Sequence, residues 1–221
     1  AWTWTEPAHN PPYEEAIKSI GELGFDGIEL ILRDFEDVEN YWTKDKRKEI
    51  KSMVDYYGLQ VSQFAMFQNV MDGLASLEEE KKNRSIEAFK NGCEISADLG
   101  CDIVNFVSPW PSTVTAPNSY LPEYYYINVP GVDPRIRALQ VFQTKLKYTF
   151  PKPFDWERYW SSHVDAVRKV AQIAKQYDFK LAIENHANTM TPHTDSILRL
   201  CEEVGEENVG ANLDTVWAYL Q

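Results

Sequence analysis

Hydrophobic residues recur along the chain with two alternating spacings, which predict helices separated by strands. Apolar residues at helical spacing, closed by a glycine or a polar turn, predict helices, and short apolar runs between them predict buried strands. The predicted helices are residues 13–24, 44–57, 77–99, 156–177 and Thr194–Val204. The predicted strands are residues 2–5, 25–32, 59–64, 102–107, Lys180–Glu184 and 209–214.

The order of these elements is a repeated strand–helix unit, which is typical of a parallel sheet, either open or closed into a barrel. No predicted strand is followed by a GxGxxG sequence or a P-loop, which argues against the open nucleotide-binding sheets. We therefore predict an α/β fold of the (β/α)8 TIM-barrel type, with residues 1–221 as a single domain. Six strands are predicted where a closed barrel has eight, so we expect a barrel incomplete at both ends, with two strands after Gln221.

Residues 108–153 interrupt the pattern after the fourth predicted strand. They are rich in proline and aromatic residues, and they are far longer than a typical loop of about 2–6 residues. We expect an insertion on the catalytic face. Its aromatic residues, including Trp110 and residues 124–126, are expected to form either a lid over the pocket or the interface of a homo-oligomer or hetero-oligomer.

Composition narrows the classes of partner. The chain has 221 residues, is 43% hydrophobic and carries a net charge of −12. Without a basic stripe, no nucleic-acid partner is expected, and no apolar run has the length of a membrane span. The three cysteines fit neither a disulfide framework nor a CxxC zinc site, which favours a cytoplasmic protein.

Polar residues are expected at the carboxyl ends of the strands, where barrel enzymes carry their chemistry. Glu184 ends an apolar strand, and a carboxylate in that place needs a partner, either a metal ion or a Lys or Arg side chain. Asp214 ends the next strand, and neighbouring parallel strands lie about 4.8 Å apart, so the two carboxylates can share one divalent cation. Such oxygen ligands favour Mn²⁺, with Mg²⁺, Co²⁺ or Zn²⁺ as alternatives.

Four segments resemble the xylose isomerase-like barrel superfamily, which includes ketose 3-epimerases, inosose dehydratases and hydroxypyruvate isomerases. The segments are residues 25–30, 99–104, 181–186 and 209–215. The resemblance implies one divalent cation held by Glu, Asp, His and Glu from four successive strands. Glu184 and Asp214 correspond to the first two ligands, and the other two are expected after Gln221.

The sequence departs from this resemblance in two ways. Epimerases of the group usually carry a substrate-contacting His three residues after the Asp, and here that position is Trp217. The DNA-repair endonucleases of the superfamily bind three zinc ions through several His residues. The four His residues and the net charge of −12 argue against that activity.

Two further residues are candidates for the chemistry. His186 follows Glu184 by two positions and is expected to face the site. It could serve as a general acid or base, bind a substrate hydroxyl, or orient Glu184. Glu29 is expected to be either an active-site carboxylate or one partner of a buried ion pair.

Aromatic and amide residues are candidates for substrate contact. Trp4 is expected either to stack on a sugar ring or to fill the core. The other proposed contacts are Asn105, Trp110 and Trp217. His163 belongs to an amphipathic helix and is expected at the surface.

Together these features predict a divalent-metal-dependent sugar isomerase or epimerase. Glu184 and Asp214 would hold the metal, which stabilises an enediolate, while a base such as His186 moves a proton next to a carbonyl. One alternative is a lyase or dehydratase acting on a keto-sugar or inosose, including elimination of the C-glycoside deglycosidase type. An alternative of another class is a non-catalytic barrel that binds a sugar or a partner protein.

Overall fold

The computed structural model describes residues 4–5, 10–115 and 148–220. The chain divides into two compact units, residues 1–111 with 156–221 and residues 112–155. The smaller unit contains an antiparallel bridge between Thr115 and Thr149. The larger unit contains the parallel sheet and all the helices described below.

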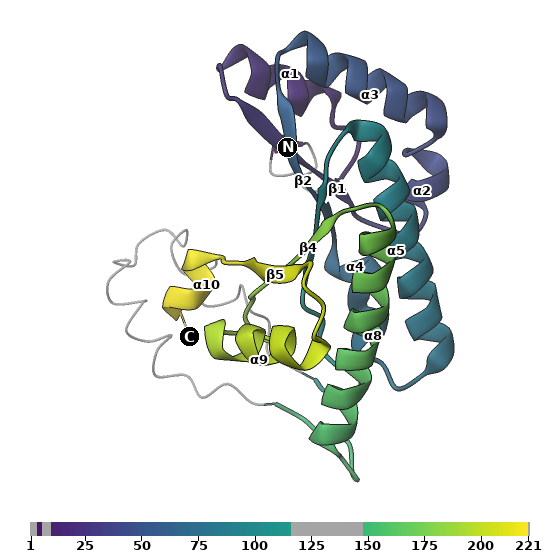
Figure 1. Ribbon diagram of the computed structural model, residues 1–221, viewed down its shortest axis with the longest axis vertical. Helices are drawn as coiled ribbons and strands as arrows, with labels where there is room; N and C mark the ends of the chain where they lie inside the picture. The colour runs from purple at the N-terminus through teal and green to yellow at the C-terminus, as the bar shows by residue number, and fades with distance from the viewer. Residues whose placement is uncertain (1–3, 6–9, 116–147, 221) are drawn as a thin grey trace, which may run out of the picture. The chain divides into compact units, whose positions relative to one another are not determined.

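A five-stranded parallel sheet forms the centre of the larger unit (Figure 1). Its strands, in spatial order, are β1 (Gly27–Leu32), β2 (Gln60–Met66), β3 (Ile103–Val107), β4 (Lys180–Glu184) and β5 (Val209–Asn212). Spatial order equals chain order, and crossovers between parallel strands are right-handed, so the connecting helices fall on one face of the sheet. This is the wall of a TIM barrel rather than a doubly wound sheet, which confirms the predicted fold class.

Helices α1, α3, α5, α8 and α9 pack against one another in that order. The helices are α1 (Glu14–Glu22), α2 (Asp37–Asn40), α3 (Lys44–Tyr56), α4 (Gln68–Met71), α5 (Glu79–Leu99), α8 (Trp156–Gln176), α9 (Thr194–Val204) and α10 (Thr215–Leu220), with the 3-10 helix η2 (Asp72–Ala75). Figure 1 shows the long helices α5 and α8 side by side. Gly100 and Gly205 end α5 and α9 in the left-handed conformation, which glycine adopts without strain.

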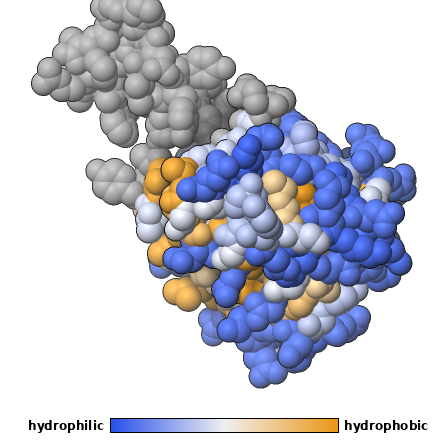
Figure 2. Space-filling view, turned by 90° about the horizontal axis from the view of Figure 1, so that it is seen from above, coloured by the Kyte–Doolittle hydropathy of each residue, from blue (hydrophilic) through white to orange (hydrophobic). Residues whose placement is uncertain are grey.

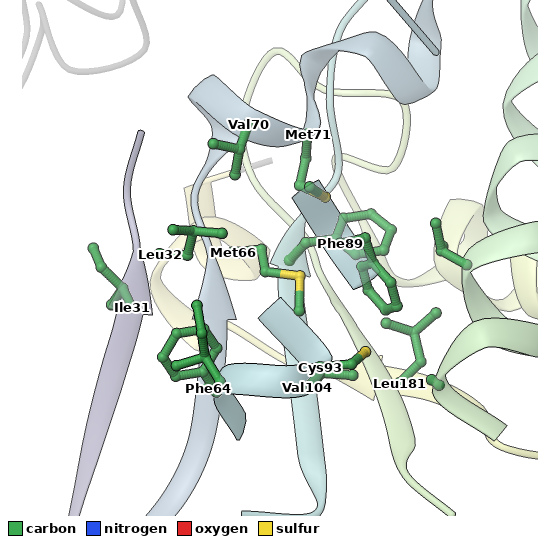
Figure 3. Packing of buried hydrophobic residues seen from close by; sticks show 14 of the residues in the cluster. Ile31, Leu32, Phe64, Met66, Val70, Met71, Phe89, Cys93, Val104 and Leu181 are labelled. Atoms are coloured by element: carbon green, nitrogen blue, oxygen red, sulfur yellow. The ribbon is translucent and has the colours of Figure 1, made fainter. Parts of the chain in front are cut away.

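The main core lies between the sheet and these helices. Figure 3 shows Met66 of β2 lying among Phe89 and Cys93 of α5 and Val104 of β3. A side chain at Gly92 would overlap the end of the Met66 side chain, so Met66 in its present position leaves room only for glycine there. This packing fixes which strand residues face the helices, and the alternate residues face the opposite side of the sheet.

The element boundaries correct several expectations. Trp4 and Thr5 form a turn rather than part of a strand, and residues 2–3 lie outside the described residues. The part of the chain that the structure describes therefore holds five strands rather than six, and the insertion follows the third of them. β5 ends at Asn212, so Asp214 lies beyond the strand.

The surface seen from above is mostly hydrophilic, with smaller hydrophobic areas between the polar groups (Figure 2). In the described residues, no helix combines the length and the apolar character needed to cross a bilayer.

His163 corrects the expectation of a surface residue, because its side chain is 0% exposed. It lies on the inner face of α8, where its Nδ1 is 3.1 Å from the carbonyl oxygen of Leu74 in η2. A carbonyl oxygen only accepts, so Nδ1 carries the proton. Nε2 is buried without a hydrogen-bond partner among the described residues, and burial lowers the pKa of His163 from 6.5 to about 4.

This burial predicts a pH-dependent loss of stability. The pKa is depressed in the folded state, so the unfolded chain binds a proton first as the pH falls. The stabilising contribution is complete above about pH 6.5 and decreases towards about pH 4. Between pH 7.5 and pH 5 the loss should be about 2 kcal/mol.

Urea unfolding of the wild type and His163→Gln at both pH values measures this loss. The variant should lose less stability than the wild type over this interval, because it lacks the titrating group. His193→Gln, which removes an exposed histidine, should behave like the wild type. If all three proteins lose the same free energy of unfolding, His163 is not responsible for the pH dependence.

Candidate active site

The face of the sheet opposite the helices carries polar side chains from all five strands. They are Glu29, Gln63, Asn105, Glu184 and Asn212. Strand register places them on one face, because Glu29 pairs with Gln63 and Glu184 pairs with Asn212. Ala65 and Ala182, each two residues from a member of this set, pair with Asn105. Glu29, Gln63 and Asn105 lie within their strands rather than at the carboxyl ends, where polar residues were expected.

Glu184 is the last residue of β4 and lies between two amides. Nδ2 of Asn212, on β5, donates a hydrogen bond of 3.0 Å to Glu184 Oε2. Nδ2 of Asn105, on β3, donates to the same oxygen at 3.4 Å. Burial is the main cause that raises the pKa of Glu184 to about 7. The charges of Glu29 and Asp214 contribute to this rise, whereas the hydrogen bonds from the two amides oppose it.

Glu29 lies on the same face of the sheet, on β1. Gln63 Nε2 donates a hydrogen bond to Glu29 Oε2, and the two residues are paired across β1 and β2. This bond does not decide whether Glu29 is an active-site carboxylate or one partner of a buried ion pair. It does show that Glu29, like Glu184, accepts a hydrogen bond from an amide on a neighbouring strand.

Hydrogen bonds to both the backbone and the side chain of Asp214 hold this residue in place. Asn185 accepts a hydrogen bond from the Asp214 N–H at 2.8 Å and donates to the Asp214 carbonyl at 3.0 Å. Asp214 Oδ1 accepts hydrogen bonds from the backbone N–H groups of Val216, at 2.8 Å, and Trp217, at 3.1 Å, and thereby caps α10. The second carboxylate oxygen, Oδ2, is not used by the cap.

His186 is buried beside Trp217, with their ring centroids 4.1 Å apart. β4 ends at Glu184, so the strand alternation that predicted the direction of His186 does not extend to it. Nδ1 of His186 is 2.9 Å from the Ala187 carbonyl oxygen and therefore carries the proton, which leaves the lone pair on Nε2. Burial lowers the pKa of His186, against the opposing influence of that hydrogen bond and of the Asp214 charge.

The remaining predicted contacts have different surroundings. Trp110 follows β3 and packs against Trp156 of α8, with ring centroids 6.0 Å apart. Trp4 is 50% exposed. Residues 124–126 lie outside the described residues, so the expected aromatic lid or interface stays a prediction.

Two residues of the site were missed by the sequence reasoning. Asn212 stands two positions before Asp214, and alternation along the strand could have placed it on the face of Glu184. Asn185 directly follows Glu184, but its bonds to the Asp214 backbone depend on the packing of two loops and leave no signal in the sequence.

The donors fit a hard divalent cation only in part. Glu184 and Asp214 supply two carboxylates, the ligand type of such ions, and Asp214 contributes to the raised pKa of Glu184, a repulsion that a cation would relieve. The described residues contain no cluster of three or more His, Cys, Asp or Glu side chains arranged to hold a metal ion. A cation bound here therefore needs ligands beyond these two side chains.

Solved structures share this architecture. The chain is similar to a 3-keto-D-glucoside 4-epimerase from E. coli, with a TM-score of 0.65, 16% identity, and coverage of 96% of this chain and 66% of that one. A probable 3-DHS dehydratase from Bacillus anthracis is similar with a TM-score of 0.63 and 14% identity, and the match covers 96% of this chain and 60% of that one. A Mycobacterium smegmatis barrel protein in complex with magnesium is similar with a TM-score of 0.58 and 15% identity, and the match covers 92% of this chain and 57% of that one.

The chain thus spans about three fifths of the length of these structures, and at such identities the likeness shows the fold. A search of curated proteins gave no match. The family model described as xylose isomerase-like TIM barrel matches residues 17–221. The chain therefore belongs to the xylose isomerase-like TIM-barrel family.

Proposed function

We propose that the chain provides the catalytic wall of a divalent-metal-dependent sugar isomerase or epimerase. The observation that carries the proposal is the position of Glu184. It is a half-buried carboxylate at the end of β4, clamped by two amides and close enough to Glu29 and Asp214 for their charges to raise its pKa. A protein gains nothing in stability from gathering like charges in this way, whereas a cation-binding site requires it.

Glu184 and Asp214 are the proposed metal ligands, with Mn²⁺ as the first candidate and Mg²⁺, Co²⁺ or Zn²⁺ as alternatives. A divalent cation at this position would polarise neighbouring hydroxyl and carbonyl groups of a sugar. Each carboxylate has one oxygen that the described hydrogen bonds do not use, Oε1 in Glu184 and Oδ2 in Asp214. These are the atoms proposed to face the cation.

His186 is the proposed acid or base. Its Nδ1 proton is directed to the Ala187 carbonyl, so a neutral ring accepts a proton at Nε2. Because burial lowers its pKa, the ring is neutral at physiological pH, which is the form that a general base requires. Glu184 is the second candidate for the proton transfer, and Trp217, Trp110 and Trp4 remain the proposed contacts to the substrate.

Elimination from a keto-sugar or inosose is the second candidate reaction. It begins with the same removal of a proton next to a carbonyl and differs in the loss of a leaving group afterwards. Trp217 favours this candidate, since its indole packs on His186 where the resemblance to epimerases leads one to expect a second histidine. NMR of the products separates the reactions, because elimination alone releases water or an aglycone.

The first test removes the proposed ligands. Glu184→Gln and Asp214→Asn keep the shape of each side chain, and the asparagine retains an oxygen that can cap α10. Substitution of residues around metal ligands weakens metal binding by about 10–100-fold, so loss of a ligand should weaken it by at least about 100-fold. Titration of the chelator-treated protein with Mn²⁺, followed by electron paramagnetic resonance, measures the change.

Glu202→Gln, at an exposed glutamate of α9, is the matched control and should bind Mn²⁺ like the wild type. The metal site is disproved if Glu184→Gln and Asp214→Asn retain the wild-type affinity for Mn²⁺, as the control does.

The second test separates catalysis from mere binding. His186→Asn should keep its affinity for Mn²⁺ but lose about 100-fold or more in turnover, which is the usual contribution of a general acid or base. The measurement is exchange of deuterium from D₂O into ketohexoses and 3-keto-glucosides, followed by NMR. A wild-type protein that binds these sugars without exchanging or converting them would instead favour the non-catalytic barrel.

A further inference from the structure

The two amides beside Glu184 form a clamp on one of its oxygens. Asn105 Nδ2 and Asn212 Nδ2 approach Oε2 from β3 and β5, the strands on either side of β4, at 3.4 and 3.0 Å. Asn105 is 1% exposed, and its amide is turned towards a carboxylate rather than a backbone group. Within the described part of the chain, both hydrogen bonds to this carboxylate go to Oε2, and none goes to Oε1.

We propose that Asn105 and Asn212 are positioning residues, which fix the carboxylate of Glu184 so that Oε1 is presented to the cation. The inference rests on the proposed metal-dependent function. The terminal torsion of glutamate is broad, so a lone carboxylate samples many orientations. Two donors on one oxygen restrict this rotation and stabilise the ionised form, and they leave the second oxygen to bind as a single-atom ligand.

A purely structural role would give a different arrangement. Asn208, in the loop before β5, shows what that looks like, since its Nδ2 donates to the carbonyls of Ala171 at 3.0 Å and Phe179 at 3.1 Å. That amide joins backbone segments and strengthens the fold. The amides of Asn105 and Asn212 converge instead on a carboxylate, that of Glu184, whose pKa is raised by burial.

The test compares Asn212→Leu with Asn208→Leu. Leucine has nearly the shape of asparagine but lacks the donor, and Asn212 is half-buried, so its replacement disturbs the fold less than that of Asn105. Both variants should lower the thermal unfolding temperature. Only Asn212→Leu should raise the dissociation constant for Mn²⁺, by about 10–100-fold. The readout is Mn²⁺ titration by electron paramagnetic resonance, which requires no substrate.

Two results overturn the positioning role alone. The first is that the wild-type protein binds Mn²⁺ and the affinity of Asn212→Leu for Mn²⁺ stays within about twofold of the wild-type value. The second is that Asn208→Leu loses as much affinity for Mn²⁺ as Asn212→Leu does. A wild-type protein that binds no Mn²⁺ overturns the proposed function and the positioning role together. The wild-type titration therefore distinguishes the failure of one from the failure of both.

Discussion

The half-buried carboxylate of Glu184 is the constraint on which the rest of the site depends. Removing a charged group from water is unfavourable unless hydrogen bonds or opposite charges compensate for the lost hydration. Two amides from the flanking strands supply part of this compensation. They reach Glu184 only while β3, β4 and β5 keep their register, so the strand pairing in the core determines the geometry of the site.

That pairing is a consequence of the order of the elements. Right-handed crossovers between consecutive strands bring the connecting helices to one face, where Met66, Phe89 and their neighbours form a tightly packed layer. In the described part of the chain, the helices that connect the strands leave the opposite face to polar side chains, so it can carry amides and carboxylates without disturbing the core. The division between a rigid apolar side and a polar side allows members of this family to change their chemistry while they keep the same packing.

The sequence revealed local features well and those that depend on contacts between distant segments poorly. The bounds of β4 and α9 were predicted correctly because each combines a clear hydrophobic period with a polar or glycine end. The position of His163 was predicted wrongly, since helical periodicity cannot tell which polar residue meets η2. The clamp of Asn212 on Glu184 was not predicted, because it follows from strand register. The pairing of Glu184 with Asp214 was proposed from strand adjacency, and the metal site itself stays a prediction.

Asp214 shows how the chemistry beside His186 can vary without loss of the carboxylate. The bonds that orient Asp214 come from the side chain of Asn185 and from the backbone N–H groups of Val216 and Trp217. Any residue except proline supplies such an N–H, so the side chain at position 217 is not constrained by the cap. The capped turn still holds that side chain against His186. Replacing a histidine by tryptophan at this position therefore removes one titratable group and adds an apolar wall, while the proposed metal ligand keeps its orientation.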